Sequence, residues 1–406
     1  MKKALSFYTK TPLILRIAIG LAIGVALGLT IPDIGGITLL GSLFVGALKA
    51  IAPVLVFVLV IASLASAGQG IGSRFRKVIL FYMLSTFLAA VVAVVGSYLF
   101  KVTIPLSESV TQTAPASLFE VFKGLLSNMV TNPITAIMNG NYVGILFWAV
   151  IFGWALRAAN AQTKEVLSDI SAAVSKAVAW VIQLAPFGIL GLVYASVGEY
   201  GLDIFTDYGK LLLLLVGCML AVAFIVDPLI VAIALKRNPY PLVFKCFKES
   251  GITAFFTRSS AANIPVNMKL CEKLGLEKEY YSVAIPLGAT INMDGAAITI
   301  TVMSLAAAFS QGISVNIVVA ILLSFVATLG ACGASGVAGG SLLLIPMACS
   351  LLGVGQDIAM QVVAVGFIVG VVQDSLETAI NSSGDVIFCA TAEYRERLQR
   401  GEEIHF

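Results

Sequence analysis

The sequence contains few charged residues. Lysine, arginine, aspartate and glutamate together make up 12% of its 406 residues, whereas hydrophobic residues make up 59%. A soluble globular domain has about 25% charged residues. Half that fraction leaves too little polar surface to cover a water-soluble particle of this length, so we expect the chain to lie in lipid. The net charge of +3 and the lack of a basic stripe exclude a nucleic-acid partner.

Residues that bind soft metals or relay protons are also scarce. The only histidine, His405, lies in a charged tail, and the six cysteines occur singly. A single thiol in an apolar run behaves as a small hydrophobic group. No HExxH, GxSxG, P-loop or nucleotide-binding motif is present. These absences disfavour transition-metal binding and a membrane enzyme, and we expect no catalytic residue and no cofactor.

Eight apolar stretches are long enough to cross a bilayer, which requires about 20 residues per helix. The first stretch follows the basic start MKKALSFYTK, as in a secretory signal peptide. It is longer than the apolar part of a signal peptide and further spans follow, so we interpret it as a transmembrane helix. The predicted spans are 11–31, 39–66, 78–100, 142–158, 174–198, 210–235, 281–308 and 361–390.

Two further apolar stretches are interrupted by polar or small residues. The stretch 249–270 contains Arg258-Ser259-Ser260, and the stretch 313–355 contains a glycine-rich tract from Gly330 to Gly340. Irregular backbone at membrane depth must be buried in protein or line a cavity. Two such interrupted segments predict re-entrant hairpins at a transporter binding site. The alternative for the glycine tract is close helix packing through small residues.

Lysine and arginine clusters predict the orientation in the membrane. With eight spans, all five clusters fall on one side, which indicates that both termini are cytoplasmic. The clusters are Lys2, Lys3 and Lys10; Arg74, Arg76 and Lys77; Lys236, Arg237, Lys245 and Lys248; Lys269, Lys273 and Lys278; and Arg395, Arg397 and Arg400.

Four carboxylates lie inside the last two predicted spans. Asp294 is the only charged residue between Tyr280 and Asp357, and the last span carries Asp374, Glu377 and Asp385. Ionisable residues at this depth are costly, so each one marks a candidate functional site. A purely structural, hydrogen-bonded carboxylate is the alternative for any single one, but it is a poor explanation for four together.

The spacing of these residues predicts a binding surface. Asp374, Thr378, Asn381 and Asp385 follow one another at i, i+4, i+7 and i+11, which is one face of a helix. Asn292 and Asp294 lie between glycines, which permit local unwinding. Carboxylates and freed backbone carbonyls suit a hard cation such as sodium, and the lack of soft ligands disfavours a transition metal.

These motifs resemble the dicarboxylate/amino acid:cation symporter family over essentially the whole chain. The resemblance is carried by Arg258-Ser259-Ser260, Asn292-Met293-Asp294-Gly295, the glycine-rich second hairpin and Asn381-Ser-Ser-Gly-Asp385. Within that family the chain is most similar to bacterial sodium:serine/threonine symporters. The resemblance implies an all-α membrane protein with eight transmembrane helices, two re-entrant hairpins and inverted repeats. It also implies a homotrimer in the bacterial inner membrane.

The resemblance also implies a division of the chain into a scaffold and a moving transport part. The expected parts are 1–77 (scaffold spans one and two), 78–100 (span three, transport part), 101–248 (scaffold spans four to six), 249–392 (transport core) and 393–406 (cytoplasmic tail).

Substrate and sodium ligands are implied by the same resemblance. Asp374 would bind the substrate ammonium with Thr378 and hairpin carbonyls, and Asn381 with the backbone near Ser260 would bind the α-carboxylate. One sodium would bind at Gly288, Asn292, Asn381 and Asp385, a second at Thr290 and the second hairpin tip, and a third at Asn292, Asp294, Tyr82, Ser85 and Thr86. The full implied substrate set is Arg258, Ser259, Ser260, Val337, Asp374, Glu377, Thr378 and Asn381.

Departures from the family pattern indicate the substrate class. Glu377 replaces an arginine that meets the side-chain carboxylate in acidic-amino-acid members, while Ala296 replaces a threonine and Gly370 an aspartate. A second carboxylate on the substrate would be repelled by Glu377, so we expect sodium-coupled symport of a small neutral amino acid, serine or threonine. We further expect Glu377 to pair with Arg258. The alternatives are an acidic amino acid or C4-dicarboxylate substrate and, in mechanism, a channel.

Overall fold

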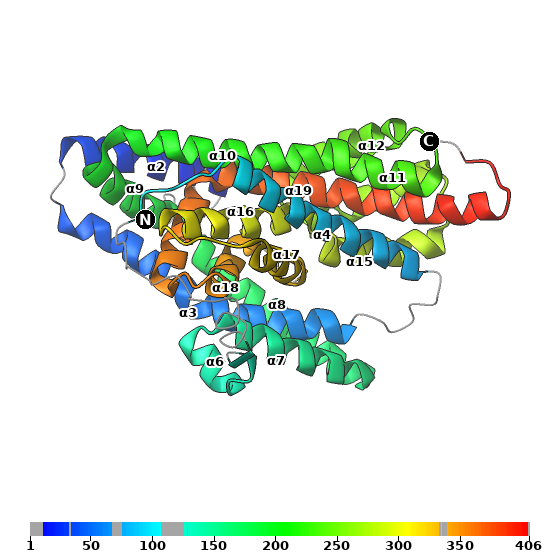
Figure 1. Ribbon diagram of the computed structural model, residues 1–406, viewed down its shortest axis with the longest axis horizontal. Coiled ribbons are helices and arrows are strands. Elements are labelled where there is room, and N and C mark those ends of the chain that lie inside the picture. The colour runs from blue at the N-terminus through cyan, green and yellow to red at the C-terminus, as the bar shows by residue number, and fades with distance from the viewer. Residues whose placement is uncertain are drawn as a thin grey trace.

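A computed structural model describes residues 11–31, 34–66, 75–106, 126–127, 129–332, 334 and 339–404. Every regular element in these ranges is a helix, so the predicted all-α class is confirmed. The helices form an elongated molecule in which most long helices run roughly along the long axis (Figure 1).

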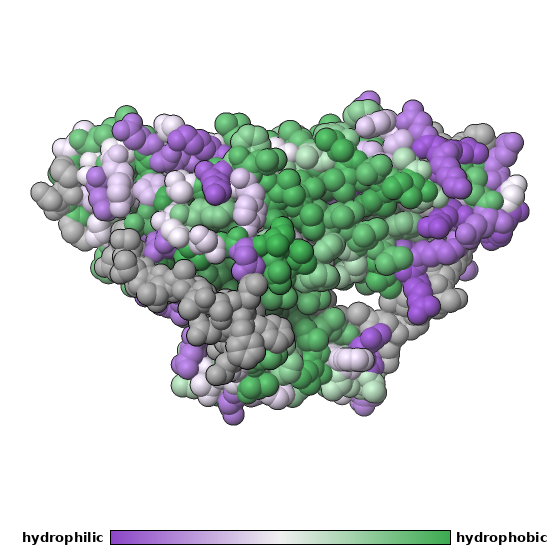
Figure 2. Space-filling model, viewed as in Figure 1, coloured by the Kyte–Doolittle hydropathy of each residue, from purple (hydrophilic) through white to green (hydrophobic). Residues whose placement is uncertain are grey.

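The long helices are apolar enough to cross a bilayer. Figure 2 shows a broad hydrophobic band across the middle of one face, with hydrophilic residues gathered at the two ends. The chain is therefore a multi-pass membrane protein. Among the described residues, five stretches are long and apolar enough to span: Gly36–Ala62, Arg76–Leu99, Ala185–Leu235, Lys278–Ser310 and Gln356–Gln399. Shorter apolar helices there are Leu15–Thr30, Gly144–Ala158, Ile317–Ala331 and Gly340–Leu351.

A first group of helices comes from the N-terminal half. α2 packs along α9, and α3 packs against α7, α8 and α9, while the short α6 lies beside α7. The bounds are α2 (Leu13–Thr30), α3 (Gly35–Ser66), α6 (Pro133–Asn139), α7 (Tyr142–Ala155), η2 (Leu156–Ala158), α8 (Ala161–Ile182), α9 (Ala185–Tyr200) and η3 (Gly201–Asp203).

A row of glycines sets the contact between α2 and α9. Gly20, Gly24 and Gly28 recur at every fourth position, and a Cβ on them would lie 2.2, 2.7 and 2.9 Å from backbone oxygens of α9. Without side chains at these positions, the two backbones approach closely, which is how transmembrane helices associate when no hydrophobic effect drives them together.

The second group surrounds α16. Its residues from Asp294 to Ala308 are all buried, and it packs against α4, α10, α17, α18 and α19. The bounds are α4 (Arg76–Leu99), α10 (Ile204–Ala221), η4 (Val222–Val226), α11 (Asp227–Leu235), α12 (Tyr240–Cys246), η5 (Phe247–Gly251), α13 (Ile252–Thr257), α14 (Ser260–Lys273), α15 (Lys278–Ile291), α16 (Asp294–Ser310), α17 (Ile317–Ala331), η6 (Gly340–Leu344), α18 (Ile345–Leu351) and α19 (Gln356–Gln399).

The chain reverses direction between α13 and α14. Arg258 ends α13 in the left-handed region, with φ at 51°, and Ser259 then caps α14 by accepting from the Ala262 N–H at 3.2 Å. Across the pair, the Ser250 hydroxyl hydrogen-bonds to Asn267 at 2.5 Å and accepts from Asn263 at 3.0 Å. This segment is therefore an antiparallel helical hairpin with the predicted Arg-Ser-Ser motif at its tip.

The second interrupted stretch also folds back on itself. α17 packs against η6 and α18, and the tip of the glycine-rich tract, including Val337, lies largely outside the described residues.

Four of the basic clusters lie near one another at one end of the molecule. Lys77 contacts Glu396 at 3.6 Å, and Arg400 contacts Glu277 at 3.8 Å. Arg237 donates to the carbonyl of Ile404 at 3.2 Å. Exposed ion pairs of this kind add little stability, but these contacts place the start of α4, the segment after α11 and the end of α19 at the same end of the molecule as the segment before α15.

One detail of the fold differs from the predictions. The predicted span 174–198 is two helices, because α8 ends at Ile182 and α9 begins at Ala185. Pro186, which has no N–H to donate, occupies the first turn of α9. The assignment of span six to the scaffold stays a prediction. The helices of that span, α10 and α11, pack mainly with α4, α16 and α19 of the second group.

Candidate functional site

The last helix presents the predicted polar face to the interior. Asp374, Thr378, Asn381 and Asp385 are exposed by only 5, 6, 3 and 0%, respectively. α19, on which they lie, packs against both helices of the first hairpin and against α15 and α16. The face is therefore enclosed by the same elements whose sequence motifs were singled out.

Asp385 lies where α4, α14 and α15 meet α19. The amide of Asn292 is 3.3 Å from one of its carboxylate oxygens and 3.1 Å from the carbonyl oxygen of Asn381. The amide of Asn267 approaches the other oxygen at 3.5 Å. A Cβ on Gly288 would lie 2.8 Å from Asp385, so only glycine permits this approach of the backbone. The structure thus brings the four residues of the first predicted sodium site together.

Asp294 begins α16, directly after a break in the helix at Asn292 and Met293. Ser85 donates to one of its carboxylate oxygens at 2.7 Å, and Thr86 donates to the other at 3.0 Å. Thr86 also accepts from the backbone N–H of Met293 at 3.1 Å. These hydrogen bonds hold the unwound segment against α4. They bring Ser85, Thr86 and Asp294 together in one cluster, as predicted.

Asp227 belongs to the same cluster, although it was not among the predicted residues. It begins α11, is 1% exposed, and lies 2.8 Å from the hydroxyl oxygen of Ser85. Ser85 therefore lies between two carboxylates from different helices. A carboxylate inside an apolar span was the criterion that identified Asp294, and it would also have found Asp227 in the stretch 210–235.

Two other predicted ligands have different neighbours. The Tyr82 hydroxyl lies 3.0 Å from the backbone carbonyl of Asp385 and 3.2 Å from that of Ala284, so it lies beside Asp385 rather than Asp294. Thr290 donates to the carbonyl of Leu287 in its own helix at 2.7 Å.

Asp374 forms an ion pair with Arg258 from the hairpin tip. The Arg258 Nη2 and Nε atoms lie 2.5 and 2.6 Å from one carboxylate oxygen. The other oxygen accepts from the Gly339 N–H at 3.3 Å. A small cavity of about 20 Å³ borders Arg258, Gly339 and Asp374, which is room for about one water molecule. The residues predicted to bind the ammonium group thus lie together, with the guanidinium in contact with the carboxylate.

The predicted pairing of Glu377 with Arg258 is wrong. Asp374 lies one turn earlier on α19 and takes the guanidinium instead. Glu377 accepts from the hydroxyls of Thr299 at 2.8 Å and Ser341 at 2.9 Å, and also from the amide of Gln373. All three donors reach the same carboxylate oxygen, and they lower the cost of burying Glu377 in the interior.

The remaining predicted substrate residues serve local roles in this conformation. Thr378 donates to the carbonyl of Asp374 at 2.7 Å, and Ser260 lies buried beside the hairpin tip. The side-chain oxygen of Asn381 accepts from the Gly295 N–H at 2.8 Å.

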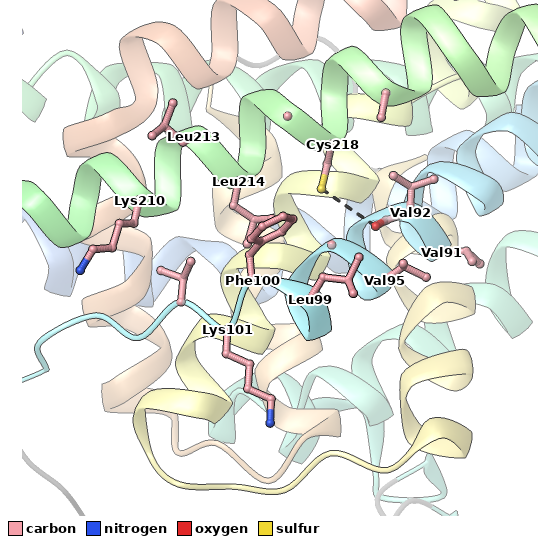
Figure 3. A pocket seen from close by; sticks show the side chains of 14 residues that line it. Val91, Val92, Val95, Leu99, Phe100, Lys101, Lys210, Leu213, Leu214 and Cys218 are labelled. Atoms are coloured by element: carbon pink, nitrogen blue, oxygen red, sulfur yellow. Dashed lines mark hydrogen bonds between the residues drawn. The ribbon is translucent and has the colours of Figure 1, made fainter.

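A larger cavity lies elsewhere, between α4 and α10. It has a volume of about 890 Å³, and Figure 3 shows a mostly apolar lining, with Val91, Val95 and Phe100 on one side and Leu213, Leu214 and Cys218 on the other. Lys101 and Lys210 also line it. It contains no predicted site residue, and an apolar wall cannot replace the hydration of a charged amino acid. The candidate site is therefore the polar cluster around α19.

The polar cluster has an excess of negative charge. Of the six buried acidic residues in the described ranges, Asp374 pairs with Arg258 and Glu393 with Arg397. The other four form no ion pair with a basic residue in those ranges, and the two buried basic residues, Arg16 and Lys164, belong to α2 and α8. Buried charges are normally paired or bound to metal ions. The four acidic residues are Asp227, Asp294, Glu377 and Asp385.

Comparison with known proteins agrees with this chemistry. Residues 13–394 match the model of the sodium:dicarboxylate symporter family. A serine/threonine transporter SstT of Bifidobacterium adolescentis is 58% identical over 98% of this chain and 93% of its own length. Proteins of the same name from Streptococcus agalactiae and Streptococcus thermophilus are 56% and 54% identical, each over 97% of this chain and 98% of their own length. The chain therefore belongs to the sodium:dicarboxylate symporter family, whose members are transporters rather than enzymes.

Proposed function

We propose that this protein carries out sodium-coupled uptake of serine and threonine by alternating access. The observation that carries the proposal is the group of buried carboxylates without basic partners, next to an ion pair that a zwitterion can replace. Such a site attracts cations and an amino acid together, as symport requires. The names of the similar proteins support serine and threonine as substrates.

Two clusters of oxygen atoms are proposed to bind sodium. The first contains Gly288, Asn292, Asn381 and Asp385, and the buried side-chain oxygen of Asn292 has no hydrogen-bond partner among the described residues. A buried carbonyl oxygen with no donor is costly unless an ion or water binds it. The second cluster contains Ser85, Thr86 and Asp294, close to the break between α15 and α16. A third site at Thr290 and the second hairpin tip stays a prediction.

The amino acid is proposed to bind at Asp374 and Asn381. Its ammonium group would replace Arg258 on the Asp374 carboxylate, and its carboxylate would take donors from Asn381 and the backbone near Ser260. Val337, Ser259 and Thr378 complete the proposed set. The cavity beside Asp374 is too small for serine in this conformation, so binding requires movement of a hairpin tip, as alternating access demands.

Glu377 supports a neutral substrate. It is buried and hydrogen-bonded one turn from Asp374, so a substrate with a second carboxylate would meet a like charge in a poorly screened site. This arrangement disfavours the acidic amino acid or C4-dicarboxylate alternative.

The proposed architecture has eight spans and two re-entrant hairpins, with both termini in the cytoplasm of a bacterial inner membrane. The moving part would contain α4, the two hairpins and α15 to α19, and the packing of α10 and α11 supports adding span six to it. The scaffold would then contain α2, α3 and α7 to α9, and a homotrimer would assemble through it. Basic side chains at the end that holds Lys77 and Arg400 support the orientation.

The proposed coupling is energetically sufficient. A membrane potential of 100 mV supplies about 2.3 kcal/mol for each charge moved. At about 1.4 kcal/mol per factor of ten, one net charge supports roughly 40-fold accumulation before any sodium gradient is added.

Uptake into proteoliposomes tests the proposal. Purified protein with an inward sodium gradient should accumulate labelled serine, and threonine should compete. Replacing sodium with choline should abolish uptake. Strong aspartate uptake that serine does not inhibit would contradict the substrate assignment, and a sodium conductance independent of amino acid would indicate a channel instead.

A further inference from the structure

The contact between Ser85 and two carboxylates has a chemical consequence. Ser85 Oγ lies 2.7 Å from an oxygen of Asp294 and 2.8 Å from an oxygen of Asp227. A hydroxyl group has only one proton to donate, so it can satisfy only one of two ionised carboxylates. The second contact then brings two electron-rich oxygens together unless a cation binds nearby or one carboxyl takes up a proton.

The protein itself supplies no such cation in the part of the chain that the structure describes. Thr86 donates to Asp294, and the Asp227 side chain has no hydrogen-bond or ion-pair partner other than Ser85 among the described residues. All three elements that meet here, α4, α11 and α16, are apolar around the cluster, and none carries a buried lysine or arginine. Two carboxylates in such surroundings repel each other and have lost their hydration.

We propose that Asp227 is a second anionic residue of the cation site formed by Ser85, Thr86 and Asp294, and that it raises the affinity of this site for sodium. This inference rests on the proposed function, because it adds a residue to a proposed sodium site. The negative charge of Asp227, on the other side of the Ser85 hydroxyl from Asp294, attracts the bound sodium ion whether or not an Asp227 oxygen contacts it.

The residues of this cation site come from three different helices. Asp294 follows the helix break before α16, Ser85 and Thr86 lie on α4, and Asp227 begins α11 directly after the π-helical turn η4. A cation that neutralises both carboxylates therefore joins three helices that would otherwise be pushed apart. Sodium binding should consequently stabilise the fold even when no amino acid is present.

The experiment compares Asp227→Asn with the wild-type protein. The purified proteins in detergent are titrated with sodium chloride at constant ionic strength, using choline chloride as replacement, and the melting temperature is recorded without amino acid. The sodium concentration for half-maximal stabilisation should rise about tenfold in Asp227→Asn, which corresponds to about 1.4 kcal/mol. The affinity for serine at saturating sodium should change less than threefold.

Ser97→Ala is the matched control. Ser97 is a buried hydroxyl on the same helix as Ser85, and its loss should leave the sodium titration unchanged. If Asp227→Asn does not fold, Asp227→Glu is used instead, because it keeps the negative charge. That variant should keep the half-maximal concentration within about threefold of wild type, and a tenfold rise would overturn the inference.

The possible failures are distinguishable. If sodium neither stabilises the wild-type protein nor supports serine uptake, the proposed function fails. If the wild type responds to sodium and Asp227→Asn gives the same titration curve, only the inference fails, and Asp227 is then a neutral hydrogen-bonding partner of Ser85.

Discussion

Replacing Asp374 with asparagine tests the substrate site most directly. In the structure its carboxylate holds Arg258 at 2.5 Å, and we propose that the substrate ammonium takes over this contact. A hydrogen bond to a charged group contributes about 1.5–3 kcal/mol, and the loss of charge attraction in a buried site adds to it. Serine affinity in Asp374→Asn should therefore fall by at least about 100-fold, which is 2.7 kcal/mol or more.

The same substitution should affect stability in a defined way. Arg258, whose side chain is 14% exposed, would lose its carboxylate partner. Breaking a fully buried pair costs about 3–5 kcal/mol, and partial exposure and the remaining asparagine oxygen should reduce this to about 1–2 kcal/mol. The melting temperature should fall by a few degrees, while sodium still stabilises the variant through Asp294 and Asp385.

The assay is serine binding by titration calorimetry at saturating sodium, combined with sodium-dependent melting curves. Asp357→Asn is the control, because Asp357 lies on the same helix but is 87% exposed and pairs with Lys49 at the surface. It should leave serine affinity unchanged. Unchanged serine affinity in Asp374→Asn would refute the role of Asp374, and a simultaneous loss of the sodium response would indicate general disruption of α19 instead.

Three further substitutions test the substrate class, the packing of α2 against α9 and the sodium site beside Asp385. Glu377→Gln removes the charge that repels a second carboxylate, so aspartate should compete with serine uptake about tenfold better than in wild type; an unchanged inhibition constant would contradict this. Gly20→Ala places a Cβ 2.2 Å from a carbonyl oxygen of α9 and should lower stability by about 1–3 kcal/mol. Its control Gly46→Ala, with no neighbour within 4 Å, should not lower the melting temperature. Gly288→Ala directs a Cβ at Asp385 and should raise the half-saturating sodium concentration at least tenfold; a normal sodium curve would separate Gly288 from the ion site.

Much of the candidate site could be predicted because charged residues are rare in membrane spans and are therefore easy to recognise in the sequence. In an apolar span each carboxylate is expensive, so Asp294, Asp374 and Asp385 were identified without a structure. Asp227 satisfies the same criterion within the predicted span 210–235, although it was not among the predicted residues. Polar neighbours such as Asn267 are harder to find, since a neutral amide in a helix is compatible with many roles.

Pairing and packing could not be predicted in the same way. Asp374 and Glu377 are one turn apart on α19, and which of them meets Arg258 depends on the angle at which the hairpin tip approaches. That angle cannot be derived from the spacing of residues in the sequence. The grouping of span six likewise depends on long-range contacts of α10 and α11, whose apolar sequence fits either group.

Asn381 connects the proposed ion and substrate sites. Its side-chain oxygen accepts from the Gly295 N–H, next to Asp294, and its carbonyl accepts from Asn292, which also contacts Asp385. A sodium ion bound at either carboxylate therefore restrains the groups that orient Asn381, and we propose that Asn381 holds the substrate carboxylate. Linkage requires that this restraint act in both directions. Serine should accordingly raise sodium affinity by the same factor by which sodium raises serine affinity.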